Sequence, residues 1–283
     1  MGTKKLIHKL LRTLFPKMYL FLLFRYSVGY WPNIKSPTRI REYIFNLKYF
    51  STNEKKDFVD KVKVRDIVQE VIAQENINLN LIEILPYTSE NTKFNLDAIN
   101  EKCFIKGNNG CGMNILFDPK NYDKKEILKS IHNWNKVEYD KVFGEKVYAG
   151  IKPKVYCERV LTCEDGFIPD DIKIHCCKGE PFMIQVIRRR DGYIQRKTYD
   201  RNWNQQNWFY KDDLDFNVDI KKIPKDDLIS IAKKLSNKHD YVRIDLYYAN
   251  KKIYFGEFTF FPASSHLPLV SNKVDETLFK YCE

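Results

Sequence analysis

The chain has 283 residues, of which 43% are hydrophobic and 14% aromatic, and its formal net charge is +11. This length allows one large or two medium domains with a sizeable core, and the composition excludes an intrinsically disordered chain. The positive charge favours anionic partners such as nucleotides, acidic sugars or an anionic membrane surface, whereas nucleic acid is disfavoured because no arginine-rich tail or aromatic RNA-binding signature occurs.

The first segment of the chain mixes apolar and basic residues at positions 4–15 and continues into an uncharged apolar run at 18–24. That run is too short to span a bilayer, and no A-x-A-like cleavage site of a signal peptide follows it. Two interpretations stay open: a helix packed on the body of the protein, or an interfacial helix on an anionic membrane. With a second short helix expected at 35–50, residues 1–54 are predicted to form a helical N-terminal region before a body at 55–283.

The next segments show the periodicities of helices and strands. A helix is predicted at residues 55–73, a strand at 77–85, a loop at 86–93 and a helix at 122–142, where Ile127, Ile131 and Trp134 are spaced for burial. Residues 156–161 are predicted to be a strand that runs into a loop.

A glycine-rich stretch at residues 107–114 lies between two short apolar runs, which predicts strand, loop and strand. Glycines let backbone N–H groups turn inward and cradle phosphate, and Lys106 at the strand end would add a positive charge. The stretch lacks the Gly-Lys-Ser/Thr of a Walker loop. An ordinary hairpin turn is the alternative interpretation.

A hairpin is predicted at residues 172–188, with its turn at 178–181. The alternation along its first strand allows Lys173 to face a cleft. The arginines at 188–190 form a basic cluster, which is either a clamp for a phosphate or an acidic sugar or simply solvated charge.

A second hairpin is predicted at residues 241–262. In its first strand Ile244 and its apolar neighbours alternate with Arg243 and Asp245, which places the two charges on one face. On the second strand, alternation alone does not decide which face Glu257 occupies. If the strands pair about a turn at 249–251, Asp245 and Glu257 lie on neighbouring strands, and two carboxylates near an arginine suit Mg²⁺ carrying a polyphosphate. The alternative is a hairpin whose charges face water.

The seven cysteines include no C-x-x-C pair. A disulfide framework or a zinc knuckle is therefore not expected, each cysteine is interpreted as a small buried residue, and a cytoplasmic location is predicted, with the inner membrane face as the site of any peripheral contact.

Taken in order and spacing, several segments resemble the TupA-like branch of the ATP-grasp superfamily, the amidoligase-type proteins of bacterial capsule and cell-wall polysaccharide synthesis. At Asn109 and Cys111 the sequence departs from the expected His and Ser. The resemblance covers roughly residues 35–268 and rests on residues 60–65, 106–114, 156–161, 171–173, 199–204, 243–245 and 256–260.

The resemblance implies an α+β ATP-grasp fold with ATP between two lobes, the smaller at about residues 101–157. It implies ligation of a carboxylate, such as a uronic-acid glycan, to an amine through an acyl phosphate. The alternatives are a kinase or glycosyltransferase, or a non-catalytic membrane- or glycan-binding protein. The resemblance implies that Mg²⁺ is bound by Asp245, Glu257 and Thr259, the last at a position where Asn is usual. It implies that the transferring phosphoryl group is contacted by Arg243 and Arg188, and that adenine is contacted by the backbone at Glu158 and Val160. The residues implied for the phosphates of ATP are Lys106, Gly107, Asn108, Gly110, Gly112 and Lys173.

Overall fold

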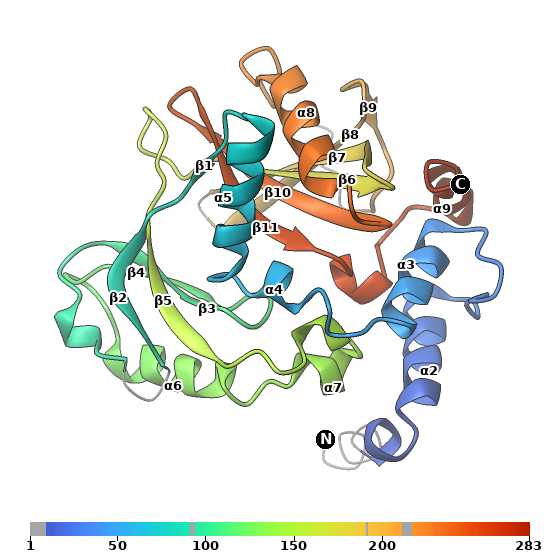
Figure 1. The fold of residues 1–283 in the computed structure, drawn as a ribbon, viewed down its shortest axis with the longest axis horizontal. Coiled ribbons are helices and arrows are strands. Elements are labelled where there is room, and N and C mark those ends of the chain that lie inside the picture. Colours follow the sequence, from blue (N-terminus) through green and yellow to red (C-terminus); the bar gives the residue numbers. More distant parts are fainter. Residues whose placement is uncertain (1–9, 91–93, 191, 211–216) are drawn as a thin grey trace.

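The fold is built on two sheets, seen in the computed structural model, which describes residues 10–90, 94–190, 192–210 and 217–283 (Figure 1). The larger sheet has seven strands in the order β1-β11-β10-β6-β7-β8-β9, and the smaller has four in the order β2-β5-β3-β4. Helices lie around both sheets, so the expected mixture of helix and sheet is confirmed.

The strand pairing is antiparallel throughout both sheets except where β1 joins β11. The large sheet contains β1 (Asn80–Leu81), β6 (Asp171–Cys177), β7 (Glu180–Arg190), β8 (Tyr193–Asp200), β9 (Gln205–Gln206), β10 (Tyr241–Ala249) and β11 (Lys252–Thr259). The small sheet contains β2 (Ile84–Glu90), β3 (Cys103–Gly107), β4 (Asn114–Phe117) and β5 (Lys154–Arg159).

The helices follow the apolar spacing of the sequence. The α-helices are α2 (Pro16–Val28), α3 (Ile40–Tyr49), α4 (Lys56–Val59), α5 (Val64–Glu75), α6 (Lys124–Trp134), α7 (Tyr139–Phe143), α8 (Lys225–Ser236) and α9 (Asn272–Phe279). Residues 10–14 are also helical. Short 3₁₀ turns are η2 (Leu96–Ala98), η3 (Lys146–Tyr148) and η4 (Pro262–Ser265).

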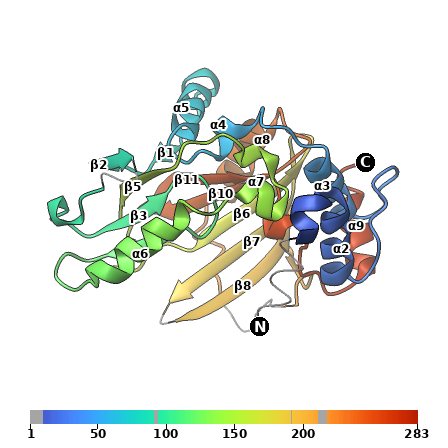
Figure 2. The same ribbon diagram turned by 90° about the horizontal axis from the view of Figure 1, so that it is seen from below.

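One face of the large sheet forms the main core. Alternate residues of β6 and β10, such as Ile174 and Ile244, are fully buried and belong to the same apolar cluster as Leu228 and Ile231 of α8. Because side chains alternate along a strand, the residues between them point to the opposite face. Figure 2 shows the small sheet beside the large one. That opposite face carries Lys173, Asp245 and Glu257.

The N-terminal helices pack beside the end of β11. In α2, Phe24 is fully buried and its ring contacts Phe45 of α3. The buried carboxylate of Asp275 on α9 accepts hydrogen bonds from Arg41 Nε at 2.7 Å and from the Tyr30 hydroxyl at 2.6 Å. The described part of the N-terminal region is thus attached to the body, while residues 1–9 lie outside the described residues.

The expectation for the cysteines was wrong at one pair. Cys177 at the end of β6 and Cys282 after α9 form a disulfide with their Cα atoms 5.2 Å apart. The two residues are 105 positions apart in the sequence. Only tertiary folding brings them together, so the spacing of the cysteines along the chain does not indicate the pair. Cys103, Cys157 and Cys176 are free and buried, as expected, whereas Cys163 is partly exposed and Cys111 is exposed, contrary to the expectation.

Three element predictions differ from the structure. The helix expected at 55–73 is broken into α4 and α5, because the Asp60 carboxylate accepts the N–H groups of Val62 and Lys63 and starts a new helix. The residues expected to form one strand at 77–85 contribute to two strands, β1 in the large sheet and β2 in the small sheet. The loop expected from residue 86 is largely β2, which accommodates Pro86 because β2 is an edge strand with a register shift at this point. The helix expected at 122–142 ends with α6 and resumes as α7.

Among the residues that the structure describes, no helix combines the length and the apolar character needed to cross a membrane.

Candidate active site

The two carboxylates of the last hairpin lie directly opposite each other. Asp245 pairs with Glu257 between β10 and β11, whereas the next pair is Leu246 with Phe255, so Gly256 is an extra residue in β11. This bulge reverses the alternation of β11 and turns Glu257 to the same face as Asp245. The bulge also explains why strand parity in the sequence left Glu257 unplaced.

The turn of this hairpin lies where the sequence predicts it, at residues 250 and 251. Asn250 and Lys251 both have positive φ angles, 52° and 60°, as a two-residue type I′ turn requires. The turn fixes the register of the two strands and therefore the position of the carboxylate pair.

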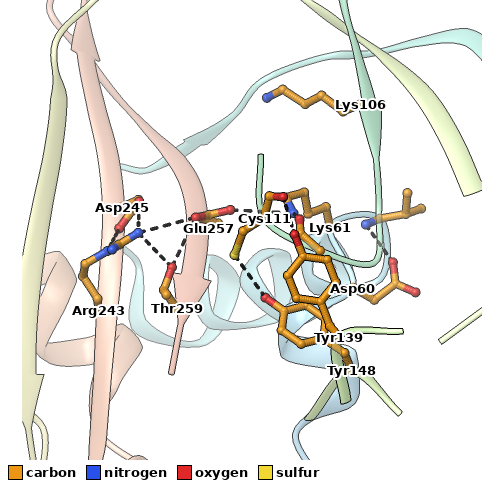
Figure 3. Close-up of polar contacts among 12 residues, drawn as sticks. Asp60, Lys61, Lys106, Cys111, Tyr139, Tyr148, Arg243, Asp245, Glu257 and Thr259 are labelled. Atoms are coloured by element: carbon orange, nitrogen blue, oxygen red, sulfur yellow. Dashed lines mark hydrogen bonds and ion pairs between the residues drawn. The ribbon is translucent and has the colours of Figure 1, made fainter. Parts of the chain in front are cut away.

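Asp245 is held by two cations. Arg243 Nε and a second guanidinium nitrogen lie 2.6 and 2.8 Å from its two oxygens (Figure 3). Lys173 on the neighbouring strand β6 forms an ion pair with it. Burial by itself would raise the pKa of Asp245, but Arg243 and Lys173 outweigh it and hold the pKa below its usual value. The carboxylate is therefore ionised at neutral pH.

Thr259 links Arg243 to Glu257. The Arg243 guanidinium donates to Thr259 Oγ1 at 3.0 Å, and that hydroxyl donates to Glu257 Oε1 at 3.2 Å. Arg243 also lies 3.5 Å from the same oxygen of Glu257. Thr259 thus orients the second carboxylate and shares its face, as Figure 3 shows.

A cavity of about 600 Å³ opens between the two sheets in front of this cluster. The small sheet contributes Lys106 and Glu158, whose side chains form an ion pair, and the large sheet contributes Lys173, Asp245 and Glu257. Apolar residues complete the walls, among them Ile82, Phe104, Leu116, Tyr156, Leu161, Ile168, Ile187 and Tyr247. A cleft with an apolar part and a charged end suits a nucleotide, whose base is apolar and whose phosphates are anionic.

The glycine-rich loop at 107–114 joins β3 to β4 at the rim of this cavity. A Cβ atom on Gly110 would lie 2.3 Å from the Tyr139 ring, and Gly112 has a φ of +70°, so both positions require glycine. Gly112 lines the cavity. Gly107 lies at the end of β3, where its N–H donates to the Met113 carbonyl.

The Asn108 side chain is not presented to the cavity. It is fully buried, donates to the Lys152 carbonyl at 3.2 Å and accepts from the Lys154 N–H at 2.7 Å. Its amide therefore anchors the loop to the segment that leads into β5, and its side chain does not face the space expected for phosphate.

Arg188 is also not brought to the cleft. Its guanidinium forms a two-point ion pair with Asp170 on the other face of the sheet, at 3.0 and 2.8 Å. Its neighbour Arg189 lines the cavity instead and pairs with Asp171. Val160 lines an adjoining cavity of about 320 Å³, which Arg189 also lines.

Lys61 and Arg189 line the cavity but had no individual role in the sequence-based interpretation. Neither could be assigned from the sequence. Counting from the turn at 178–179 places Arg188 on the face of Lys173, but a register shift between His175 and Cys176 leaves Phe182 as an extra residue in β7 and brings Arg189 to that face instead. Lys61 lies between α4 and α5, and only tertiary folding brings it to Glu257, 3.8 Å from Oε2.

The oxygen donors present fit a magnesium ion. Among the described residues no group of three or more His, Cys, Asp or Glu could enclose a metal. Mg²⁺ does not need such a cage, because it is commonly bound by one or two carboxylates and completes its shell with water and substrate phosphates. The facing pair of Asp245 and Glu257 is such a donor set.

Comparison with known structures returns ligases as neighbours at low similarity. D-alanine–D-alanine ligase from Bacillus anthracis has 14% identity and a TM-score of 0.42, with 84% of this chain and 65% of that chain covered. The enzyme of the same name from Helicobacter pylori has 13% identity and a TM-score of 0.42, with 80% and 60% covered. L-amino acid ligase from Bacillus licheniformis has 10% identity and a TM-score of 0.43, with 79% and 49% covered. The chain thus spans about half to two thirds of the length of these proteins.

The sequence matches none of the curated proteins. A family model described as TupA-like ATPgrasp, however, matches residues 42–282, which is most of the chain and contains every residue of the cavity named above. The family and the fold expected from the sequence are confirmed. The chain belongs to the TupA-like ATP-grasp family, whose members use ATP with Mg²⁺.

Proposed function

We propose that this chain joins a carboxylate to an amine at the expense of ATP. The observation that carries the proposal is the facing pair Asp245 and Glu257, surrounded by Lys61, Lys173 and Arg243, at the charged end of a cleft between two sheets. These cations neutralise the carboxylates, and a metal bound between the carboxylates would free the cations to face phosphate.

In this proposal Asp245 and Glu257 hold Mg²⁺, which supplies charge cancellation on the phosphates of ATP. Lys106 and the backbone of the loop at 107–112 bind the triphosphate, and the backbone at Glu158 and Val160 meets the adenine. Lys173 and Arg243, which bind Asp245 in the free protein, face the transferring phosphoryl group. Thr259 keeps the Glu257 carboxylate oriented.

The reaction has two steps. A carboxylate oxygen of the substrate attacks the γ-phosphorus of ATP, the bond from that phosphorus to the ADP oxygen breaks, and an acyl phosphate and ADP result. The amine nitrogen then attacks the acyl carbon, the carbon–oxygen bond to phosphate breaks, and the nitrogen loses a proton to water. Because both substrates of the first step are anions, the site must supply positive charge between them.

For the substrate we propose a uronic-acid-containing glycan, or its precursor, of a bacterial surface polysaccharide. This rests on the resemblance of the sequence to proteins of capsule and cell-wall synthesis and on the formal net charge of +11, which favours acidic partners. Residues 55–283 would form the catalytic body, with the small lobe at about 101–157.

The test is ADP release by the purified protein, measured against a panel of uronic acids and amino acids with and without amines. A ligase requires Mg-ATP, a carboxylate and an amine together and yields one amide per ADP. ADP formation with an acceptor but without any amine, and with a phosphorylated product, would identify a kinase. Turnover of a nucleotide sugar without ATP would identify a glycosyltransferase.

We also propose that residues 1–54 dock the protein on an anionic membrane surface. No acidic residue precedes Glu42, whereas the basic residues before it are Lys4, Lys5, Lys9, Arg12, Lys17, Arg25, Lys35, Arg39 and Arg41. The N-terminal apolar surface consists of exposed Leu10, Leu14, Phe15, Met18, Leu22 and Tyr26. Exposed apolar residues beside basic ones, without acidic ones, are typical of helices that lie in a membrane interface.

Vesicles of phosphatidylserine and phosphatidylcholine test this docking. Sedimentation should carry the protein down with the anionic vesicles at low salt, and salt should release it. The double substitution Met18→Glu with Leu22→Glu should abolish sedimentation without lowering thermal stability, because both side chains are exposed. Absence of lipid binding, or a dimer that forms through this surface instead, would overturn the proposal.

A further inference from the structure

Lys61 lies at the break between α4 and α5. The Asp60 carboxylate accepts hydrogen bonds from the N–H groups of Val62 at 3.0 Å and Lys63 at 3.4 Å, and thereby starts α5. Lys61 thus lies in a rigid bend whose backbone is fixed on its C-terminal side. The bend aims its side chain between the two sheets and into the cavity (Figure 3).

Three contacts connect Lys61 to the glycine-rich loop and to the carboxylate pair. Its backbone N–H donates to the Asn108 carbonyl at 3.2 Å, and its ammonium donates to the Gly110 carbonyl. The same ammonium lies 3.8 Å from Glu257 Oε2, and the side chain is only 17% exposed. A single residue outside both sheets therefore joins the loop of the small sheet to a metal-binding candidate of the large one.

The other cations of the cleft occupy different positions. Lys106 is paired with Glu158 on the small sheet, and Lys173 is paired with Asp245. Lys61 instead approaches Glu257 at Oε2, the oxygen opposite to the one that faces Arg243 and Thr259. A carboxylate that turned toward a metal would release its ammonium partner, which would then be free to pair with a phosphate of the nucleotide.

We propose that Lys61 contacts the γ-phosphoryl group of ATP and, through its hydrogen bond to the Gly110 carbonyl, connects that group to the glycine-rich loop. The inference rests on the proposed function and adds a residue to its phosphate site. In the free protein the Lys61 ammonium is shared between Glu257 and the Gly110 carbonyl. With the triphosphate bound it keeps the loop carbonyl and exchanges the carboxylate for the γ-phosphate. ADP lacks that phosphate, so Lys61 distinguishes ATP from ADP.

The test compares, by isothermal titration calorimetry with Mg²⁺, the affinities for a non-hydrolysable imido analogue of ATP and for ADP. Lys61→Gln retains a donor for the Gly110 carbonyl but carries no charge. It should reduce the preference for the ATP analogue over ADP by about tenfold, because a hydrogen bond to a charged group is lost. Its affinity for ADP should stay within about twofold of wild type. Lys61→Arg, which keeps the charge, should retain most of the preference.

Lys63→Gln is the matched control. That lysine is two residues away, its side chain is 57% exposed and its ammonium pairs with Asp57 at the surface. It should leave both affinities unchanged. An unchanged preference in Lys61→Gln, an equal loss of affinity for both nucleotides, or a wild-type protein without any preference would each overturn the assignment. A wild-type protein that binds neither nucleotide would contradict the ligase proposal itself, which separates the two failures.

Discussion

A Cβ atom added to Gly256 would lie 2.9 Å from the backbone carbonyl oxygen of Asp245, closer than side chains normally approach. The two residues touch because Gly256 is the extra residue of the bulge that turns Glu257 toward Asp245. Because Gly256 has no side chain, β11 can bulge at this residue and bring Glu257 opposite Asp245.

The substitution Gly256→Ala should separate the two carboxylates. We expect the free energy of unfolding to fall by about 1–3 kcal/mol, because the methyl group meets backbone rather than a flexible side chain. ADP formation should fall by about a hundredfold, since small displacements in an active site are costly. Urea denaturation and an ADP-release assay measure the two effects. Lys252→Ala, an exposed change on the same strand, is the control, and a Gly256→Ala protein with full activity would contradict the role of the bulge.

The two carboxylates should respond differently to neutral substitution. Glu257→Gln should remain folded and lose about a hundredfold or more in ADP formation, because the side chain is 30% exposed and its cations remain near water. Asp245→Asn should in addition lower the free energy of unfolding by about 3 kcal/mol, because Arg243 and Lys173, whose side chains are only 14% and 12% exposed, lose their common partner. Thermal denaturation of both variants checks this difference. Equal stability of the two proteins would show that the ion pairs of Asp245 are not required for folding.

The arginine pair at the end of β7 offers a test of which face of the sheet binds substrate. Arg189→Ala should raise the Kd for Mg-ATP or the KM for the carboxylate by about tenfold, because Arg189 lines the cleft. Arg188→Ala should leave both constants unchanged, because its partner Asp170 lies on the other face. Calorimetry and steady-state kinetics distinguish the substrates. A larger loss in the Arg188 variant would place the anion site on that opposite face.

Acid should destabilise the protein through His175. This histidine is fully buried and its ring nitrogens lie 2.7 Å from the Tyr241 hydroxyl and 3.2 Å from Gln185 Oε1. Burial, with a smaller contribution from Arg243, lowers its pKa from 6.5 to about 3. Because the folded state holds the neutral ring, the stabilisation is complete above pH 6.5 and is lost as the pH falls from 6.5 toward 3.

The loss due to His175 should reach about 2 kcal/mol between pH 7 and pH 5. Urea denaturation at these two pH values measures it, and His175→Gln should make the change with pH smaller by that amount. If the variant and the wild type show the same dependence on pH, the acid sensitivity lies in other groups.

The sequence predicted the hairpins, their turns, the family and the identity of the carboxylate pair, because these depend on local alternation and on short motifs. It did not predict the position of Glu257, which depends on where one glycine bulges, or the side of the sheet on which Arg188 lies. The position of Lys61 in the cleft and the pairing of Cys177 with Cys282 depend on contacts between distant segments, which local periodicity does not reveal. The break at Asp60 had a local cause, but the helical spacing on either side of it masked the cap.

The hydrogen bond between Arg41 and Asp275 joins residues 234 positions apart. The ribosome therefore completes α3 long before it makes the buried carboxylate that α3 needs. Until α9 emerges, Arg41 Nε and the Tyr30 hydroxyl lack the carboxylate that both bind, so α2 and α3 are expected to acquire their native packing late although they are made early. Throughout synthesis, the basic and apolar residues around α2 would therefore be free to meet the proposed lipid surface before the two sheets are complete.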